Sequence, residues 1–200
     1  MPLARATAAL GLVAGVLALT YAGQRTVRLV MGRQPAGHYL VPTNQGVEPI
    51  GRVATLPGAR PKDLAVSPDG SRVAVLSTAG VHIFLTSGQR VGGTAFSGGA
   101  RGIAWSPDGA TLYVSTATDR VARITERDGD WRVRSTSRVD VPDPSPWERG
   151  ETAHPTGLAI SPDGRRLYVA LSKRNKVAFV DHATLQTTEA VAVGAAPYHL

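Results

Sequence analysis

The four residues Ser-Pro-Asp-Gly occur three times in this chain of 200 residues, at 67–70, 106–109 and 161–164. The proline fixes φ at the second position of a turn, and the aspartate accepts a hydrogen bond from the backbone two residues further on. The glycine then adopts the left-handed conformation that closes the turn. A short apolar run precedes each copy and another follows it. Each copy is therefore predicted to join two antiparallel strands in a hairpin.

The residues after each hairpin form a larger repeat, whose copies start 39 and 55 residues apart. Alternating apolar residues predict a third strand in each copy, at 81–85, 121–124 and 177–180. The same alternation predicts fourth strands at 91–96, 131–139 and 187–193. Four short strands separated by turns are typical of one blade of a β-propeller, and no apolar stripe at helical spacing follows residue 23. We therefore expect an all-β fold, an incomplete β-propeller of about three four-stranded blades near 60–97, 100–140 and 155–194.

The longer second spacing is explained by an insertion at 141–151, which is rich in proline and acidic residues and interrupts the strand pattern. We expect it to form a loop that projects from one face. Residues 196–200 align with the starts of the first and third repeats, so a fourth blade is expected to begin at Pro197. Propellers typically contain 4–8 blades, and residues 51–200 are therefore expected to be part of a longer protein.

Residues 1–23 have the pattern of an export signal. Arg5 precedes an apolar run from Ala6 to Ala22, and Thr20 and Ala22 are small residues at the two positions that a signal peptidase inspects. A membrane-spanning helix needs about 20 apolar residues, and this run is slightly shorter. We expect a cleaved signal peptide and export to the periplasm or the medium. The alternative is a helix retained as a membrane anchor, with the rest of the chain outside the cytoplasm.

Residues 24–50 are rich in turn-forming residues and lack periodicity, which predicts a linker with one short strand near 38–41. Arg52 to Leu56 alternates between polar and apolar residues and predicts a further strand. A single strand before the first repeat of a circular fold can pair with the last blade and cover its edge.

The third repeat resembles a YVTN-type, YncE-like β-propeller repeat, through residues 155–170 and 175–181, and the resemblance extends over residues 51–200. The asparagine that usually follows the Tyr-Val motif is absent, and Leu171 stands nearby. In addition, 32–35, 41–45 and 56–64 resemble the start of bacterial proteins that join an exported YncE-like propeller to a C-terminal phosphoesterase of the alkaline-phosphatase type. That resemblance implies a catalytic domain outside these 200 residues and no catalysis by these residues.

The residues that suggest chemistry fall into two groups. The acidic residues and glycines of the repeated turns are expected to be structural: Asp69, Gly70, Asp108, Gly109, Asp163 and Gly164. In a propeller, the segments that enter the innermost strands lie at the mouth of the central channel. Here they carry residues that would give the mouth a positive lining, suited to an anionic ligand: Arg60, Lys62, Arg101, His154, Tyr198 and His199. The alternative is an ordinary polar rim.

The sequence favours an extracytoplasmic propeller that binds or scaffolds, with an anionic small molecule or a protein as its partner. The chain has no cysteine and its five histidines lack metal-ligand spacing, so no metal site and no cofactor are expected. The scattered arginines that give a net charge of +7 indicate no specific nucleic-acid site, and membrane contact is expected only if residues 1–23 are retained. Two alternatives stay open, the propeller part of a two-domain phosphoesterase and a lactonase-like propeller enzyme. In all three cases this segment is not expected to be catalytic by itself, so whether the whole protein is an enzyme stays open.

Overall fold

The computed structural model describes residues 31–34, 38–43, 45–56, 58–96, 99–139, 141 and 152–200. The expected signal or anchor at 1–23 and nearly all of the insertion at 141–151 lie outside these residues. The chain divides into two compact units, Met1–Gly51 and Arg52–Leu200. Every regular element in the described ranges is a β-strand, so they contain no helix that could cross a membrane.

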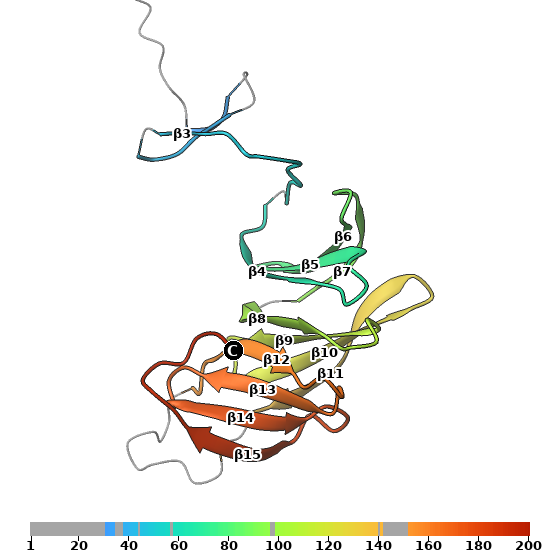
Figure 1. Ribbon diagram of the computed structural model, residues 1–200, viewed down its shortest axis with the longest axis vertical. Helices are drawn as coiled ribbons and strands as arrows, with labels where there is room; N and C mark the ends of the chain where they lie inside the picture. Colours follow the sequence, from blue (N-terminus) through green and yellow to red (C-terminus); the bar gives the residue numbers. More distant parts are fainter. Residues whose placement is uncertain are drawn as a thin grey trace, which may run out of the picture. The chain divides into compact units, whose positions relative to one another are not determined.

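The described part of the first unit is a small antiparallel sheet within the range expected to be a linker. It contains β1 (Gly32–Arg33), β2 (Tyr39–Leu40) and β3 (Gly46–Val47), in the order β1-β2-β3 (Figure 1). Tyr39 pairs with both Arg33 and Val47, and Leu40 is buried.

The second unit consists of three four-stranded antiparallel sheets, which we call blades 1, 2 and 3, each with its strands in sequence order (Figure 1). Blade 1 contains β4 (Pro61–Val66), β5 (Arg72–Ser77), β6 (Gly80–Leu85) and β7 (Arg90–Ala95). Blade 2 contains β8 (Gly99–Trp105), β9 (Thr111–Thr116), β10 (Arg120–Arg127) and β11 (Asp130–Arg138). Blade 3 contains β12 (Pro155–Ile160), β13 (Arg166–Leu171), β14 (Lys176–Asp181) and β15 (Thr187–Ala192). The predicted all-β fold with three four-stranded blades is therefore confirmed.

The strand expected at Arg52 to Leu56 is wrong, because these residues form no strand. An isolated extended segment becomes a strand only when a sheet edge supplies its backbone partners. No strand pairing of the described residues includes this segment, whose alternating pattern alone does not hold it in a sheet.

Each Ser-Pro-Asp-Gly copy forms the turn between the first two strands of its blade. In blade 1, Gly70 has a φ of 71° and donates its N–H to the Ser67 carbonyl at 2.8 Å. The Ser67 hydroxyl oxygen accepts the N–H of Arg72 at 2.9 Å, across the mouth of the hairpin. The same bonds recur in the turns that begin at Ser106 and Ser161, so one local sequence builds the same hairpin three times.

The first strands of the three blades lie next to one another, since β8 contacts both β4 and β12. Gly102 is needed at this contact, because a Cβ there would lie 2.0 Å from the carbonyl oxygen of Thr156. Gly157 stands at the equivalent position of β12 and makes a similar contact: it donates its N–H to the Tyr198 carbonyl at 2.9 Å. The first strands therefore pack backbone against backbone.

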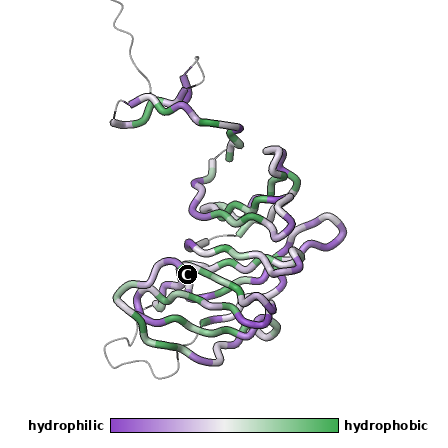
Figure 2. The backbone as a smooth tube through the Cα atoms, viewed as in Figure 1, coloured by the Kyte–Doolittle hydropathy of each residue, from purple (hydrophilic) through white to green (hydrophobic). Residues whose placement is uncertain are grey.

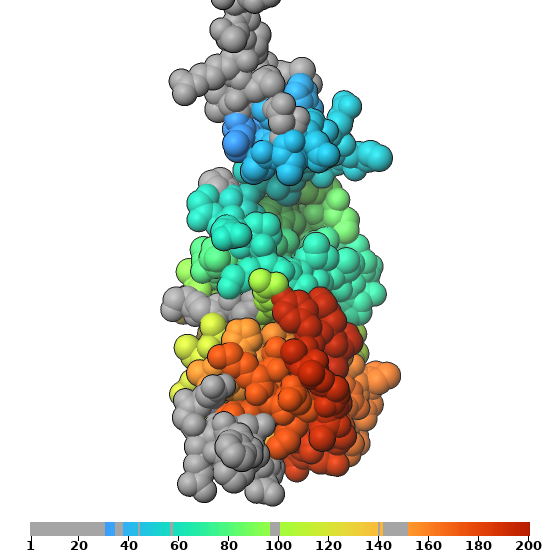
Figure 3. Space-filling view, turned by 90° about the vertical axis from the view of Figure 1, so that its left-hand side faces the viewer, coloured from blue at the N-terminus to red at the C-terminus, as the bar shows by residue number. Residues whose placement is uncertain are grey.

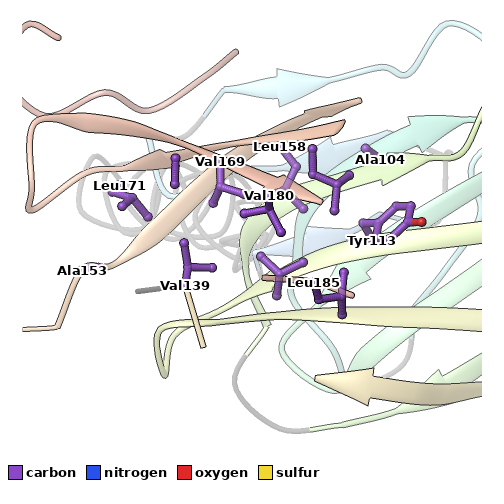
Figure 4. Close-up of a cluster of buried hydrophobic side chains, with 12 residues drawn as sticks. Ala104, Tyr113, Val139, Ala153, Leu158, Val169, Leu171, Val180 and Leu185 are labelled. Atoms are coloured by element: carbon purple, nitrogen blue, oxygen red, sulfur yellow. The ribbon is translucent and has the colours of Figure 1, made fainter. Parts of the chain in front are cut away.

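Two hydrophobic clusters hold the blades together, and in Figure 2 hydrophobic residues concentrate in the strands while the β10–β11 turn is hydrophilic. The cluster between blades 1 and 2 joins Ala74 and Leu76 of β5 to Leu112 and Val114 of β9. The cluster between blades 2 and 3 is drawn in Figure 4 and includes Tyr113. Neighbouring residues of β9 thus face opposite blades, as the period of a strand requires.

One face of blade 1 is left open. Leu64 and Val66 of β4 are 60% and 54% exposed. The residues at the same positions of β8 are Ile103 and Trp105, which are 6% and 5% exposed because they pack on blade 1. In the same position of β12, Leu158 is buried in the cluster with blade 2. The face of blade 1 that corresponds to these contacts is not covered by the described residues.

Candidate functional site

A cavity of about 250 Å³ lies where the chain enters β4. Its lining comes from both ends of the first hairpin and from the start of β8: Arg60, Pro61, Lys62, Thr78 and Arg101. Arg60 donates its N–H to the Thr78 hydroxyl at 3.2 Å, and Thr78 donates its N–H to the Arg60 carbonyl at 3.1 Å. These two bonds fix the backbone on one side of the cavity.

The lining of this cavity carries three positive side chains and no carboxylate. Arg60, Lys62 and Arg101 are all exposed, so each stays solvated while it contributes to the local potential. The nearest acidic residue in the chain, Asp63, uses Oδ1 to accept the N–H of Leu64 at 2.9 Å. A concave surface with charges of one sign concentrates counter-ions, which is the arrangement expected of an anion site.

Arg101 connects the cavity to the C-terminal segment. Its guanidinium donates to the Tyr198 hydroxyl and lies 5.3 Å from the centre of the tyrosine ring. The Tyr198 ring contacts the His199 ring, with centroids 5.6 Å apart. In the space-filling view of Figure 3, the dark red C-terminal segment lies beside yellow-green residues of blade 2. The tyrosine therefore restricts the position of one cation of the cavity.

His154 takes part in none of these contacts. Its N–H donates to Oδ1 of buried Asp119 at 3.1 Å, and its carbonyl accepts the N–H of Ser172 at 3.1 Å. Its φ of 51° places it in the left-handed region, just before β12 begins. Of the six predicted mouth residues, the structure thus brings three to one cavity, attaches Tyr198 and His199 through Arg101, and holds His154 by its backbone elsewhere.

The lining contains one polar side chain that the sequence did not indicate, the hydroxyl of Thr78. The signal was available in the pairing of the first hairpin, because Pro61 pairs with Ser77 and so places Thr78 opposite Arg60. A hydroxyl here adds a small neutral donor to the three cations.

Solved structures provide the comparison with known proteins. The hydrazine synthase of Kuenenia stuttgartiensis has a TM-score of 0.58 and 26% identity, over 74% of this chain and 40% of that chain. The periplasmic gluconolactonase PpgL of Pseudomonas aeruginosa has a TM-score of 0.57 and 20% identity, over 80% and 48%. The WD40 repeats of RRP9 have a TM-score of 0.57 and 18% identity, over 72% and 41%. The sequence matches no protein-family model and no curated protein.

The three blades have the β-propeller fold. The chain spans 40–48% of the length of these structural neighbours. In a propeller the blades surround a central channel. The cavity is built at the starts of β4 and β8, the first strands of two adjacent blades, and these strands contact one another.

The carboxylates of the propeller's repeated turns are engaged by their own turns. Hydrogen bonds from the hydroxyls of Ser67 and Ser71 and from the Ser71 N–H hold the pKa of Asp69 well below its usual range. The Ser106 hydroxyl likewise lowers the pKa of Asp108, and the Ser161 hydroxyl lowers that of Asp163. These acids are therefore anionic at neutral pH and act as acceptors that close the hairpins.

Blade 1 contains a serine–histidine contact, between the Ser77 hydroxyl and Nε2 of His82 at 2.9 Å. The Ser77 hydroxyl also lies 3.0 Å from the Gly80 carbonyl, and its oxygen accepts the N–H of Ala79 at 3.1 Å. Burial, together with the charge of Arg90, lowers the pKa of His82. These contacts tie the Ser77 side chain to the turn between β5 and β6 and to the His82 ring on β6.

Proposed function

We propose that this chain is an extracytoplasmic propeller module that binds a small anionic ligand and does not itself catalyse a reaction. The observation that carries this proposal is the convergence of Arg60, Lys62 and Arg101 on one cavity without a carboxylate. The net charge of +7 would favour the approach of an anion from solution.

The residue types in the lining suit a carboxylate or a phosphate group. A guanidinium offers two parallel N–H donors to such a group, and a lysine adds a compact charge. Arg101 is partly oriented by Tyr198, which reduces the entropy that the side chain would lose on binding. A cavity of about 250 Å³ suits a compact anion better than a polymer.

The binding site is tested by calorimetric titration of the 200-residue chain with citrate and with inorganic phosphate at constant ionic strength. Replacing Arg101 and Lys62 together by glutamine is expected to lower affinity by tenfold or more, because two charged donors are lost. The matched control, R132Q with R165Q, removes the same charge at exposed positions outside the cavity. Equal affinity of the R101Q/K62Q variant and the wild type would contradict the proposal.

The module is further proposed to function within a larger ring. Support comes from the open face of blade 1, where Leu64 and Val66 are exposed although the same positions of β8 are buried. A further blade on this face would bury both side chains, as blade 1 buries Ile103 and Trp105. The reading frame beyond Leu200 tests this, since more blades encoded there are the expected finding. A stop codon, together with a monomeric species by light scattering, would contradict it.

The extracytoplasmic location rests on the apolar run between Ala6 and Ala22. Cell fractionation with a C-terminal tag is expected to recover the protein in the periplasm, in the medium, or on the outer side of the membrane. Full-length protein in the cytosol, protected from protease added to spheroplasts, would overturn this location.

The cationic cavity also favours a second candidate function, the propeller part of a two-domain phosphoesterase. The cavity would then attract phosphorylated substrates toward a catalytic domain outside these 200 residues. An alkaline-phosphatase-type domain in the downstream reading frame would support this candidate. A frame that encodes only further blades would support the free-standing propeller.

A further inference from the structure

A groove of about 640 Å³ separates blades 2 and 3 beside their Ser-Pro-Asp-Gly turns. It shares no lining residue with the cavity at Arg101, so it is a separate feature. Its volume lies within the range typical of small-ligand sites, about 300–1,000 Å³.

The corresponding groove between blades 1 and 2 is filled by Arg72. Its guanidinium lies 5.1 Å from the ring of Trp105 and 5.7 Å from the ring of Trp131. It also donates to the Gly109 carbonyl and pairs with the Glu126 carboxylate, each at 3.2 Å. One long cationic side chain thus occupies the space that two adjacent blades enclose.

Blade 2 has Thr111 at the position that Arg72 occupies in blade 1. Both residues stand five places after the turn serine, and both donate the backbone N–H to its hydroxyl at 2.9 Å. The threonine side chain is too short to reach across to blade 3, so the groove that it lines stays open. In the turn of blade 3, the Gly164 carbonyl is equivalent to the Gly109 carbonyl that accepts from Arg72. The Gly164 carbonyl has no hydrogen-bond donor among the described residues.

The charged residues of this groove are separated by sign. The acids Asp108 and Asp163 lie in the turns next to β8 and β12, whereas Arg123 and Arg134 lie on β10 and β11, on the far side of β9. Glu126 and Arg127, which also line the groove, are paired with Arg72 and Asp128. His182 of blade 3 also lines the groove. The groove thus has two carboxylates at the end beside its turns and two guanidinium groups at the end formed by β10 and β11.

Both ends keep unused hydrogen-bonding groups. Asp108 and Asp163 use only Oδ1 in the hydrogen bonds of their turns, which leaves each Oδ2 without a hydrogen-bond donor in the part of the chain that the structure describes. Arg123 donates through Nη1 alone, to the carbonyls of His182 and Ala183, and Arg134 donates through Nε alone. Each guanidinium has five N–H donors, so both can bind a further acceptor.

We propose that this groove binds a short peptide with free ends. The peptide's ammonium group would bind the Asp108 and Asp163 carboxylates, and its carboxylate would bind Arg123 and Arg134. Adjacent strands are about 4.8 Å apart, so the backbone segments that carry the two sets of charges are separated by roughly 5–10 Å. An extended chain spans about 3.3–3.6 Å per residue, which matches a dipeptide or tripeptide.

The experiment titrates the 200-residue chain with trialanine, N-acetyl-trialanine and trialanine amide, using calorimetry. Trialanine is expected to bind at one site, and blocking either end is expected to weaken binding by tenfold or more, because the charge that both residues at that end of the groove would bind is lost. Thr111→Arg should abolish binding, since it restores the side chain that fills the groove between blades 1 and 2. Trialanine that shows no saturable binding would overturn the proposal, as would a Thr111→Arg variant that folds and binds normally.

A second variant keeps the test independent of whether Thr111→Arg folds. Arg134→Gln should weaken trialanine about tenfold and leave the affinity for trialanine amide unchanged, because the amide lacks the carboxylate. Arg132→Gln is the matched control, since Arg132 lies on the same strand, pairs with Asp130 and does not line the groove. Equal losses for trialanine and its amide in Arg134→Gln would overturn the proposed orientation. Failure of the anion site would leave all these outcomes unaffected.

Discussion

Arg101 donates a hydrogen bond to the hydroxyl of Tyr198, a residue 97 positions later in the chain. The contact joins the first strand of blade 2 to the segment that follows blade 3. Since Arg101 also lines the cationic cavity, the tyrosine connects the proposed ligand site to the packing of the propeller.

The two parts of this contact can be separated by substitution. Tyr198→Phe removes the hydrogen bond and keeps the ring, whereas Tyr198→Ala removes both. We expect losses of about 0.5 and about 1 kcal/mol in the free energy of unfolding, because the site is exposed and its cation–π contact is weak. Urea denaturation measures both values. An alanine variant as stable as the wild type would show that the contact does not order the segment.

Gly102→Ala is expected to destabilise the propeller by about 1–3 kcal/mol or more, as overpacked sites do. The added Cβ would meet the Thr156 carbonyl at 2.0 Å, and backbone cannot move aside as a flexible side chain can. Gly194→Ala is the matched control, since nothing lies within 4 Å of its Cβ position. Thermal unfolding should separate the two variants by several degrees, and equal melting temperatures would contradict the close approach of β8 and β12.

The turn aspartates predict a specific dependence of stability on pH. The pKa of Asp69 is lower in the folded chain than in the unfolded chain, so its contribution is complete above the unfolded pKa of about 3.9. The contribution is lost as pH falls from there toward the folded pKa. Asp69→Asn should therefore be less stable than the wild type at pH 7, and the difference should shrink below about pH 4. Urea denaturation at a series of pH values checks this, and a difference that is constant down to pH 2 would contradict it.

The open face of blade 1 gives a contrast between equivalent positions. Replacing Leu64 and Val66 by glutamate should change the unfolding free energy of this chain by about 0.5 kcal/mol or less, because both side chains are exposed. Ile103→Ala, at the position in β8 that corresponds to Leu64, should cost about 2–5 kcal/mol because its side chain is buried. Similar losses for the two variants, measured by denaturant unfolding, would show that the face of blade 1 is covered in solution.

Much of the fold could be predicted because its information is local. The sequence from Ser67 to Gly70 determines a turn, the alternation beside it determines which strand faces are apolar, and three copies determine the repeat. The segment from Arg52 to Leu56 shows the limit of this reasoning, since its alternation depends on a pairing partner that the local sequence does not contain.

The candidate site was less predictable, because side-chain convergence depends on packing between blades. Charge and position in the repeat indicated Arg60, Lys62 and Arg101 together. They could not show that His154 is held by Asp119 or that Thr78 completes the lining. The groove between blades 2 and 3 was missed for a related reason. It is open because Thr111 is shorter than Arg72 at the equivalent position, and a short side chain at one position of a repeat forms no recognisable sequence pattern.

The arrangement of the two hydrophobic clusters has a consequence for how the molecule opens. Of the three blades, blade 2 alone has both faces covered by described residues, with one cluster on each side. Blades 1 and 3 each share one cluster, so either can detach while the other contact is kept. In this 200-residue chain, amide protons of β9 and β10 should therefore exchange with deuterium more slowly than those of β5, β6, β13 and β14.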